Sequence, residues 1–455
     1  MLGLLDVAER VSSGPIIDEK ERDISYYNRM RQLIKEYKIE VPKNVTGFNP
    51  DYSLADDAFQ AALHFLSSVG TYCINNRRVV KFTEEEIKQA IKEIPSEVAI
   101  GLGMDTRRIR RREIEDKQPV SSFGALASPY SEDLLPLVIK NFAQISRIDA
   151  LIGFCTSVTD GHEIYGGPME AYATIRETAW MRDGIRKAGR QGMGLILYPI
   201  STKASAMIAA LDPDYGLRRT DGVLLSLLPD MKMELDFLTS AIVFEQYGCF
   251  KCNGGGEGYV EGFCGGLDGA IIESIARNIT AWMVYRDSIQ NAGVLYFSTV
   301  GGKMALSTAW PTSVVHQALR RNTNIISMDT NCSVSGPGTE AGLLEKSARA
   351  IASAINGSNL YDSRAFFARE NAAQTPLEPE FAIEVTDATI RAGIKRADGG
   401  EIIRKIEEKF VGKPPEEGKS IRECYNLEKH LPSKEYQNIY EKVKKQLADL
   451  GLKFE

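Results

Sequence analysis

The chain has 455 residues with a formal net charge of −6 at pH 7, and 43% of its residues are hydrophobic. These values are typical of an ordinary globular protein with a large core, and so mild a charge produces no global field that attracts nucleic acid or an anionic membrane. No apolar run approaches the roughly 18–20 residues of a membrane-spanning helix, and the N-terminus lacks the basic start of a signal peptide. We therefore expect a cytoplasmic protein without nucleic-acid or membrane partners.

The cysteines support this expectation. There are seven, an odd number, and most lie inside apolar patterns, as expected for reduced thiols in a cytoplasmic protein. Cys249 and Cys252 form a C-x-x-C pair that is compatible with a redox site or half a zinc site. No second pair exists and no histidine lies near Cys249 in sequence, so we expect buried cysteines and no metal.

Residues 1–95 have the pattern of a helical extension. Thr83 and Glu86 form a capping box, apolar residues follow at helical spacing, and Pro95 stops the helix. From residue 96 the hydrophobic pattern changes, because short apolar runs begin to alternate with longer amphipathic helices. The candidate strands are 98–104, 149–155, 193–198, 222–228, 248–252, 294–298, 324–329 and 365–370.

Eight candidate strands separated by helices predict an α/β fold, a TIM (β/α)8 barrel over residues 96–395. A doubly wound open sheet is the alternative, because the number of strands does not show that the sheet closes. Residues 396–455 are predicted to form a C-terminal helical extension that packs on the barrel. Its last helix begins after Ser433 as N-cap and ends at Gly451.

Catalytic groups of such a barrel lie at the C-terminal ends of its strands. Glu257 and Glu261 lie in a glycine-rich loop after the fifth candidate strand, where backbone is able to approach a ligand closely. Asp329, Thr330 and Asn331 end the seventh. Ordinary loop and turn geometry explains both segments equally well.

Two further polar segments follow early strands. Asp160 stands near a histidine and a glutamate after the second candidate strand, which suggests acid–base chemistry or a plain polar loop. After the first, five arginines crowd into DTRRIRRRE. Arg107, Arg108 and Arg110 either dock an acidic partner or a phosphate-bearing cofactor, or form a solvent-facing ribbon balanced by nearby acids.

Several long segments resemble the monomethylamine methyltransferases of methanogenic archaea. They are GTYCINNRRVVKFTEEEI (70–87), SPYSEDLLP (128–136), AGRQGMG (188–194), GPGTEAGLLEKSARAI (336–351) and ECYNLEKHLPSKEYQNIYEKVKKQLADLGLKF (423–454). The resemblance implies a TIM barrel that assembles into homohexamers and passes a methyl group from methylamine to cobalt in a separate corrinoid protein. It also implies that the corrinoid belongs to the partner and is not bound tightly by this chain.

The family's distinguishing feature is pyrrolysine, a lysine derivative whose electrophilic imine captures the amine. Placing the shared GMG in register puts Ile196 at that position, and isoleucine has no electrophile, charge or transferable proton. Two glutamates and a glutamine surround the ring in the family. Their aligned positions are Val223 or Leu224, Gly254 or Gly255, and Thr330.

The resemblance therefore suggests a relative that works without pyrrolysine and takes a methylated amine or quaternary ammonium compound. Its cation would rest against Tyr198 and a carboxylate such as Glu257, Glu261 or Asp329. A quaternary ammonium already carries a neutral leaving group and needs no imine. A barrel recruited to other acid–base or lyase chemistry, and a binding subunit without catalysis, are the alternatives.

Overall fold

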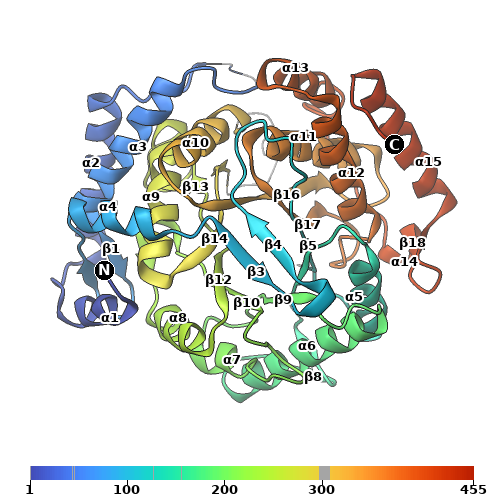
Figure 1. Cartoon of the computed structure of the whole chain (residues 1–455), viewed down its shortest axis with the longest axis horizontal. Coiled ribbons are helices and arrows are strands. Elements are labelled where there is room, and N and C mark those ends of the chain that lie inside the picture. Colours follow the sequence, from blue (N-terminus) through green and yellow to red (C-terminus); the bar gives the residue numbers. More distant parts are fainter. Residues whose placement is uncertain (1, 44, 46, 127, 155, 297–307) are drawn as a thin grey trace.

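A computed structural model describes residues 2–43, 45, 47–126, 128–154, 156–296 and 308–455. Eight parallel strands form a closed barrel at its centre (Figure 1). In chain order they are β5 (Ser122–Ala125), β6 (Ala150–Ile152), β9 (Gly194–Leu197), β10 (Gly222–Leu224), β12 (Phe250–Asn253), β14 (Asp287–Asn291), β16 (Ile326–Ser335) and β17 (Asn359–Phe367). Each pairs with the next, and β17 pairs with β5, so the predicted TIM barrel is confirmed and the open sheet is excluded.

A helix follows each strand and covers the outside of the barrel. These helices are α5 (Leu135–Gln144), α6 (Pro168–Lys187), α7 (Ala204–Ile208), α8 (Leu235–Tyr247), α9 (Leu267–Tyr285), α10 (Ala309–Asn322), α11 (Glu340–Asn356) and α12 (Leu377–Ala392). Pro168 occupies the first turn of α6, where its missing N–H costs no hydrogen bond.

Two of the candidate strands are wrong. Residues 98–104 include β3 (Glu97–Ile100), which pairs antiparallel with β4 (Arg107–Arg110) outside the barrel. The first barrel strand is instead β5, whose sequence SFGA holds one large apolar residue. The sixth is β14, a buried but mostly polar DSIQN, whereas β15 (Val294–Leu295) pairs with β13 (Gly258–Tyr259) outside the barrel. Residues 297 and 298 of that candidate lie outside the described part of the chain.

The β3–β4 hairpin closes the N-terminal end of the barrel. The N–H of Gly101 donates to the carbonyl of Thr220 over 3.1 Å, and that of Leu102 donates to Gly192 over 2.8 Å. Both acceptors come just before a barrel strand begins. Ile100 and Ile109 of the hairpin are fully buried in the same apolar cluster as the inward-facing strand residues.

This lumen cluster fills the inside of the barrel with hydrocarbon. Its buried members are Ile100, Ile109, Phe123, Ala125, Ala150, Ile152, Ile196, Leu224, Cys252, Ile289, Ile326, Met328 and Tyr361. Alternate strand residues face opposite sides, so Val223 belongs instead to the outer core between strands and helices. The barrel is thus a packed core and not a pore.

The N-terminal helices are α1 (Leu4–Ser13), α2 (Glu19–Glu36), α3 (Tyr52–Val69) and α4 (Glu84–Glu93), and the C-terminal ones are α13 (Arg396–Glu407), α14 (Ile421–Cys424) and α15 (Lys434–Asp449). The capping box of Thr83 and Glu86 is present at α4, and Ser433 caps α15. Figure 1 shows the first group beside α9 and α10 and the second beside α11 and α12. Both groups share the outer core with the barrel helices, and the domain divisions after residues 95 and 395 stay a prediction.

Short strands complete the structure. β1 (Thr71–Cys73), β2 (Arg78–Val80) and β11 (Lys232–Met233) form one small sheet, and the pairs β7 (Val158–Thr159) with β8 (His162–Glu163) and β18 (Tyr425–Asn426) with β19 (Leu431–Pro432) form two others. Within the described ranges, no helix is long and apolar enough to cross a membrane.

Gly254 and Leu224 are packed so closely that the effect on stability of a substitution at residue 254 should depend on the side chain at residue 224. A Cβ at residue 254 would lie 2.5 Å from Cδ2 and 3.0 Å from Cγ of Leu224. We predict that Gly254→Ala lowers the free energy of unfolding by about 1–3 kcal/mol through overpacking. In a Leu224→Ala background the same change should cost nothing, and urea denaturation of the four proteins measures this. Equal costs in both backgrounds would contradict the packing described.

Candidate active site

A cavity of about 70 Å³ lies beside the C-terminal ends of β14 and β16, between α10, α11 and α13. Its charged lining consists of Glu257, Asp329, Arg349 and Glu407, and Thr330 adds a hydroxyl group. The remaining lining is largely apolar. A small cavity with three carboxyl groups and one guanidinium is suited to a small cation.

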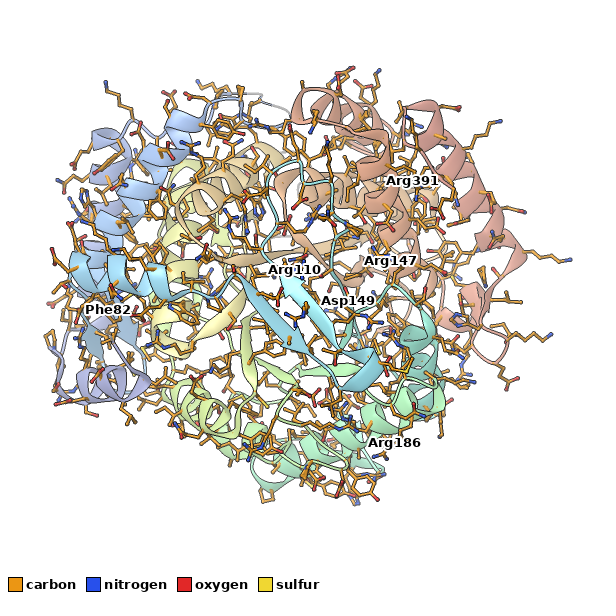
Figure 2. All side chains as sticks on the ribbon, viewed as in Figure 1. Phe82, Arg110, Arg147, Asp149, Arg186 and Arg391 are labelled. Carbon is orange, nitrogen blue, oxygen red and sulfur yellow. The ribbon has the colours of Figure 1, made fainter. Side chains whose placement is uncertain are left out.

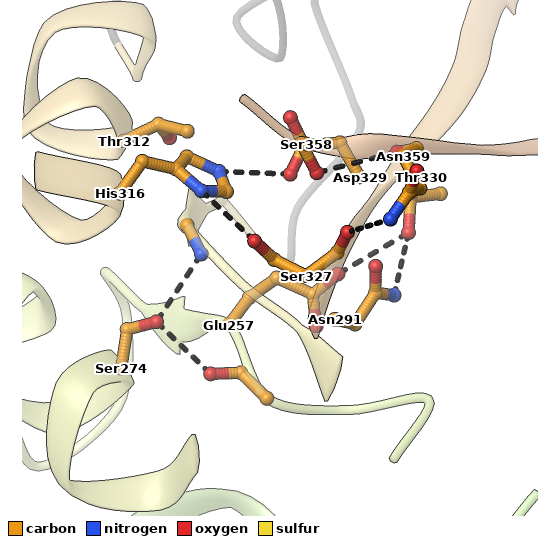
Figure 3. Close-up of polar contacts among 12 residues, drawn as sticks. Glu257, Ser274, Asn291, Thr312, His316, Ser327, Asp329, Thr330, Ser358 and Asn359 are labelled. Atoms are coloured by element: carbon orange, nitrogen blue, oxygen red, sulfur yellow. Dashed lines mark hydrogen bonds and ion pairs between the residues drawn. The ribbon is translucent and has the colours of Figure 1, made fainter. Parts of the chain in front are cut away.

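Glu257 is a buried acid in the loop that follows β12. Its side chain is 7% exposed, and its Oε1 accepts a hydrogen bond from Oγ1 of Thr330 over 3.3 Å. That hydroxyl in turn accepts from Nδ2 of Asn291 over 2.7 Å (Figure 3). Among the described residues, Oε2 has no hydrogen-bond partner. Burial raises the pKa of Glu257, and the charge of Asp329 adds to the effect, while Arg277 opposes it.

The loop that carries Glu257 is held in place through its backbone. The fully buried guanidinium of Arg277 donates to the carbonyl oxygens of Glu257 and of Leu227, the latter over 2.5 Å. The loop also runs directly against β14, since a Cβ at Gly256 would lie 2.0 Å from the carbonyl oxygen of Asn291. Only glycine permits this approach, so the glycines here are needed for packing.

Asp329 faces α10 on the outer side of β16. Its Oδ1 lies 2.8 Å from Nε2 of His316, within ion-pair distance, and His316 is fully buried (Figure 3). The other ring nitrogen, Nδ1, lies 3.4 Å from Oγ of Ser327, which accepts a hydrogen bond from Arg320. These contacts fix the ring and hold the carboxyl of Asp329 at the cavity wall.

Glu407, the last residue of α13, brings the third carboxyl group. Its side chain is 2% exposed, and its Oε1 has no hydrogen-bond partner in the described part of the structure. Burial raises the pKa of Glu407 to about 8, although Arg349 opposes the rise. Arg349 also donates to the carbonyl of Thr330 over 3.4 Å, which links α11 to the end of β16.

The structure brings together three of the residues that the sequence suggested, namely Glu257, Asp329 and Thr330. Glu261 lies in the same loop but is exposed outside the cavity. Asn331 points elsewhere, because its Nδ2 donates to Oδ1 of Asp362 over 3.0 Å within a buried network.

The other suggested residues lie apart from this cavity. Tyr198 follows β9 and packs half-buried against the lumen cluster, and Ile196 lies fully buried inside that cluster. Asp160 lies in an exposed turn, where it accepts hydrogen bonds from Tyr172 over 2.6 Å and from Nε of Arg176 over 2.8 Å. These contacts pair Asp160 with side chains of α6, and its role in binding stays a prediction.

The arginine cluster lies on the hairpin at the opposite end of the barrel. Figure 2 shows Arg110 on this hairpin, in front of the barrel strands. Arg108 and Arg110 both pair with Glu97, and Arg107 lies 3.4 Å from Asp149, just before β6. The placement disfavours these residues as the docking site of a partner that acts at the C-terminal end.

Sequence reasoning missed His316, Asn291, Arg349 and Glu407. The histidine, Arg349 and Glu407 come from helices, and Asn291 comes from the polar strand β14. Their only signal in the sequence is a polar residue inside an otherwise apolar pattern, and such residues are common in any large protein.

The raised pKa of Glu257 has a consequence for stability. From about pH 4.5 upward the unfolded chain loses this proton while the folded protein keeps it, so the residue destabilises the fold increasingly until pH reaches the folded pKa. We predict that the melting temperature of Glu257→Gln, relative to the unmodified protein, rises as the pH increases above the ordinary range of a glutamate pKa. Glu261→Gln, in the same loop but exposed, should give a flat difference. A flat difference for both would contradict the burial.

Comparison of the chain with known proteins identifies a family that it resembles along nearly its whole length. The family model of the monomethylamine methyltransferase MtmB matches residues 2–452. Methyltransferases MtmB1 of Methanosarcina barkeri and MtmB2 of Methanosarcina acetivorans are 29% identical over 423 residues, which is 89% of this chain and 88% of each relative.

Solved structures agree on the fold. The crystal structure of Methanosarcina barkeri MtmB matches with a TM-score of 0.89 and 24% identity, covering 99% of this chain and 98% of that one. A hydroxylamine complex of MtmB matches equally well. With the family model spanning nearly every residue, this chain belongs to the monomethylamine methyltransferase family.

Proposed function

We propose that this enzyme moves a methyl group from a small methylated ammonium compound to the cobalt of a separate corrinoid protein, without pyrrolysine. The observation that carries the proposal is the acidic cavity at the C-terminal end of β16, within a chain that matches the methyltransferase family over residues 2–452. An ammonium ion is a permanent or near-permanent cation at neutral pH, and carboxyl groups with unpaired oxygens are its natural partners.

The proposed absence of pyrrolysine rests on Ile196. At that position a saturated side chain lies fully buried among other apolar groups, with Leu224 in the same cluster. An imine requires water or an acid nearby to exchange its proton, and this layer supplies hydrocarbon instead. The register that aligns Ile196 with the family's modified residue stays a prediction.

The transfer itself needs a good leaving group and a strong nucleophile. The carbon–nitrogen bond of the donor breaks with its electron pair remaining on nitrogen, and the reduced cobalt of the partner supplies both electrons of the new bond to the methyl carbon. The products are a neutral amine and a methylated corrinoid protein. The chain's own residues hold and orient the donor.

We assign Glu257 and Asp329 to hold the cation, with Thr330 fixing the carboxyl of Glu257. Tyr198, which the sequence suggested for the same cation, lies apart from this cavity against the lumen cluster, so we assign it no contact with the donor. Glu261, exposed on the same loop, would attract cations toward the entrance. Asn331 and Asp160 have protein partners, so we assign them no contact with the donor.

The corrinoid protein must reach the C-terminal end of the barrel, because the hairpin and the lumen cluster close the other end. Assembly into a homo-oligomer, as the family resemblance implies, is part of the proposal.

The test is to mix the purified protein with a reduced corrinoid protein and follow cobalt methylation by absorbance. We predict methylation from at least one of methylamine, dimethylamine, trimethylamine and glycine betaine. The double variant Glu257→Gln/Asp329→Asn should slow it by about 100-fold or more, because two charge-assisted contacts are lost. Arg108→Ala, on the remote hairpin, should leave the rate within about twofold. No methylation from any of these donors, with several corrinoid proteins, would contradict the proposal.

A further inference from the structure

We propose that Glu407 of the C-terminal extension is a ligand-binding residue, and that with Glu257 it selects cations that carry N–H donors. This inference rests on the proposed function for its class of ligand. It assigns a role to a helix, α13, that lies outside the barrel and supplies one wall of the cavity.

The first support is that two carboxyl oxygens, which belong to residues that line the cavity, lack partners in the described part of the structure. Oε2 of Glu257 and Oε1 of Glu407 are buried and make no hydrogen bond within the described ranges of the chain. Buried carboxyl oxygens almost always have a donor, so these two require an explanation, and the same lining holds an amide nitrogen, Nδ2 of Asn356, that is also unpaired among the described residues. A ligand with two or more N–H groups would satisfy both at once.

The second support is the size and shape of the cavity. Its volume of about 70 Å³ exceeds the roughly 10–15 Å³ that one water needs on the same measure. A ligand of a few heavy atoms therefore fits. Apolar side chains, among them Val294, Ala348 and Ile403, complete the lining and suit a methyl group beside the charged nitrogen.

The third support is the balance of charge. The titratable groups around Glu407 are Arg349 on α11, Glu257 after β12, and Asp329 on β16 with His316 behind it. Among these groups, three carboxyl groups thus face only two basic groups, the guanidinium of Arg349 and the imidazole of His316. A bound cation lets Glu407, whose pKa burial raises to about 8, give up its proton and become a charged acceptor.

Selection follows from the chemistry of the acceptors. A primary ammonium offers three N–H donors, whereas a quaternary ammonium offers only methyl groups and leaves both oxygens unpaired. Unpaired buried polar groups are the strongest means by which a site rejects a close analogue. The structure therefore favours a donor with N–H groups over the betaine-like donors that the sequence also suggested.

The experiment measures binding to the full-length protein by titration calorimetry, without any corrinoid protein. We predict that methylammonium binds saturably and at least tenfold more tightly than tetramethylammonium. Glu407→Leu removes the acceptor and should weaken methylammonium binding about tenfold or more, while Glu407→Gln, which retains an accepting oxygen, should lie between. Because Glu407 is largely protonated at neutral pH, its glutamine variant closely matches the resting side chain and should fold normally.

Proton release separates a binding role from a structural one. Repeating the titration at pH 7 in buffers of different ionisation enthalpy counts the protons released when methylammonium binds. We expect release by the unmodified protein and a smaller release by Glu407→Gln. Glu401→Gln, on the same helix but exposed and paired with Arg404, should behave like the unmodified protein.

Each outcome bears on one claim. Unchanged affinity and proton release in both Glu407 variants, or no saturable methylammonium binding at all, would overturn the inference. Binding that depends on Glu407 without cobalt methylation would support the site and refute the proposed transfer. Cobalt methylation that is indifferent to Glu407 would support the transfer and refute this site.

Discussion

The filled lumen is the constraint on which the rest of this molecule depends. Thirteen buried apolar side chains, two of them from the β3–β4 hairpin, pack inside the barrel and close its N-terminal end. A charged ligand cannot share such a layer without losing its hydration, which costs far more than any single contact returns. Polar chemistry is therefore confined to the other end, where strands stop and their loops begin.

At that end the fold gathers three acids and one arginine from four different segments of the chain. Glu257 enters from the loop after β12, Asp329 from β16, Glu407 from α13, and Arg349 from α11 as the counter-charge. Two of the acids are held in place by neighbouring groups. Arg277 donates a hydrogen bond to the backbone carbonyl of Glu257, and His316 lies within ion-pair distance of Oδ1 of Asp329. The site is thus organised before a ligand arrives, so little ordering remains to be done on binding.

Much of this fold could be predicted from the pattern of apolar residues, but the exceptions are informative. Strands such as β9 and β10 can be recognised in the sequence, because continuous apolar runs are typical of strands that are buried on both faces. β5 cannot be recognised in this way because three of its four residues, in the sequence SFGA, have small side chains or none. β14 cannot be recognised because its side chains are mostly polar, although they are buried beside polar neighbours such as Lys251. Residues 98–104 have the continuous apolar run of a barrel strand, yet only Ile100 of β3 is buried, so the apolar run alone does not distinguish this hairpin from the barrel.

The candidate site was predictable to a similar degree. Searching the strand ends found Glu257, Asp329 and Thr330, because parallel strands of a barrel end at one face. It could not find Glu407 or His316, which reach the site only after helices far apart in sequence pack against the closed barrel. It also assigned ligand contacts to Asn331 and Asp160, whose protein partners are visible only in three dimensions.

The most direct measurement of the central claim is a crystal structure of the protein grown with methylammonium. We predict electron density for the ligand in the cavity beside β16, within hydrogen-bond distance of Glu257 and Glu407. Ligand density inside the barrel next to Ile196, with the acidic cavity holding only water, would contradict it.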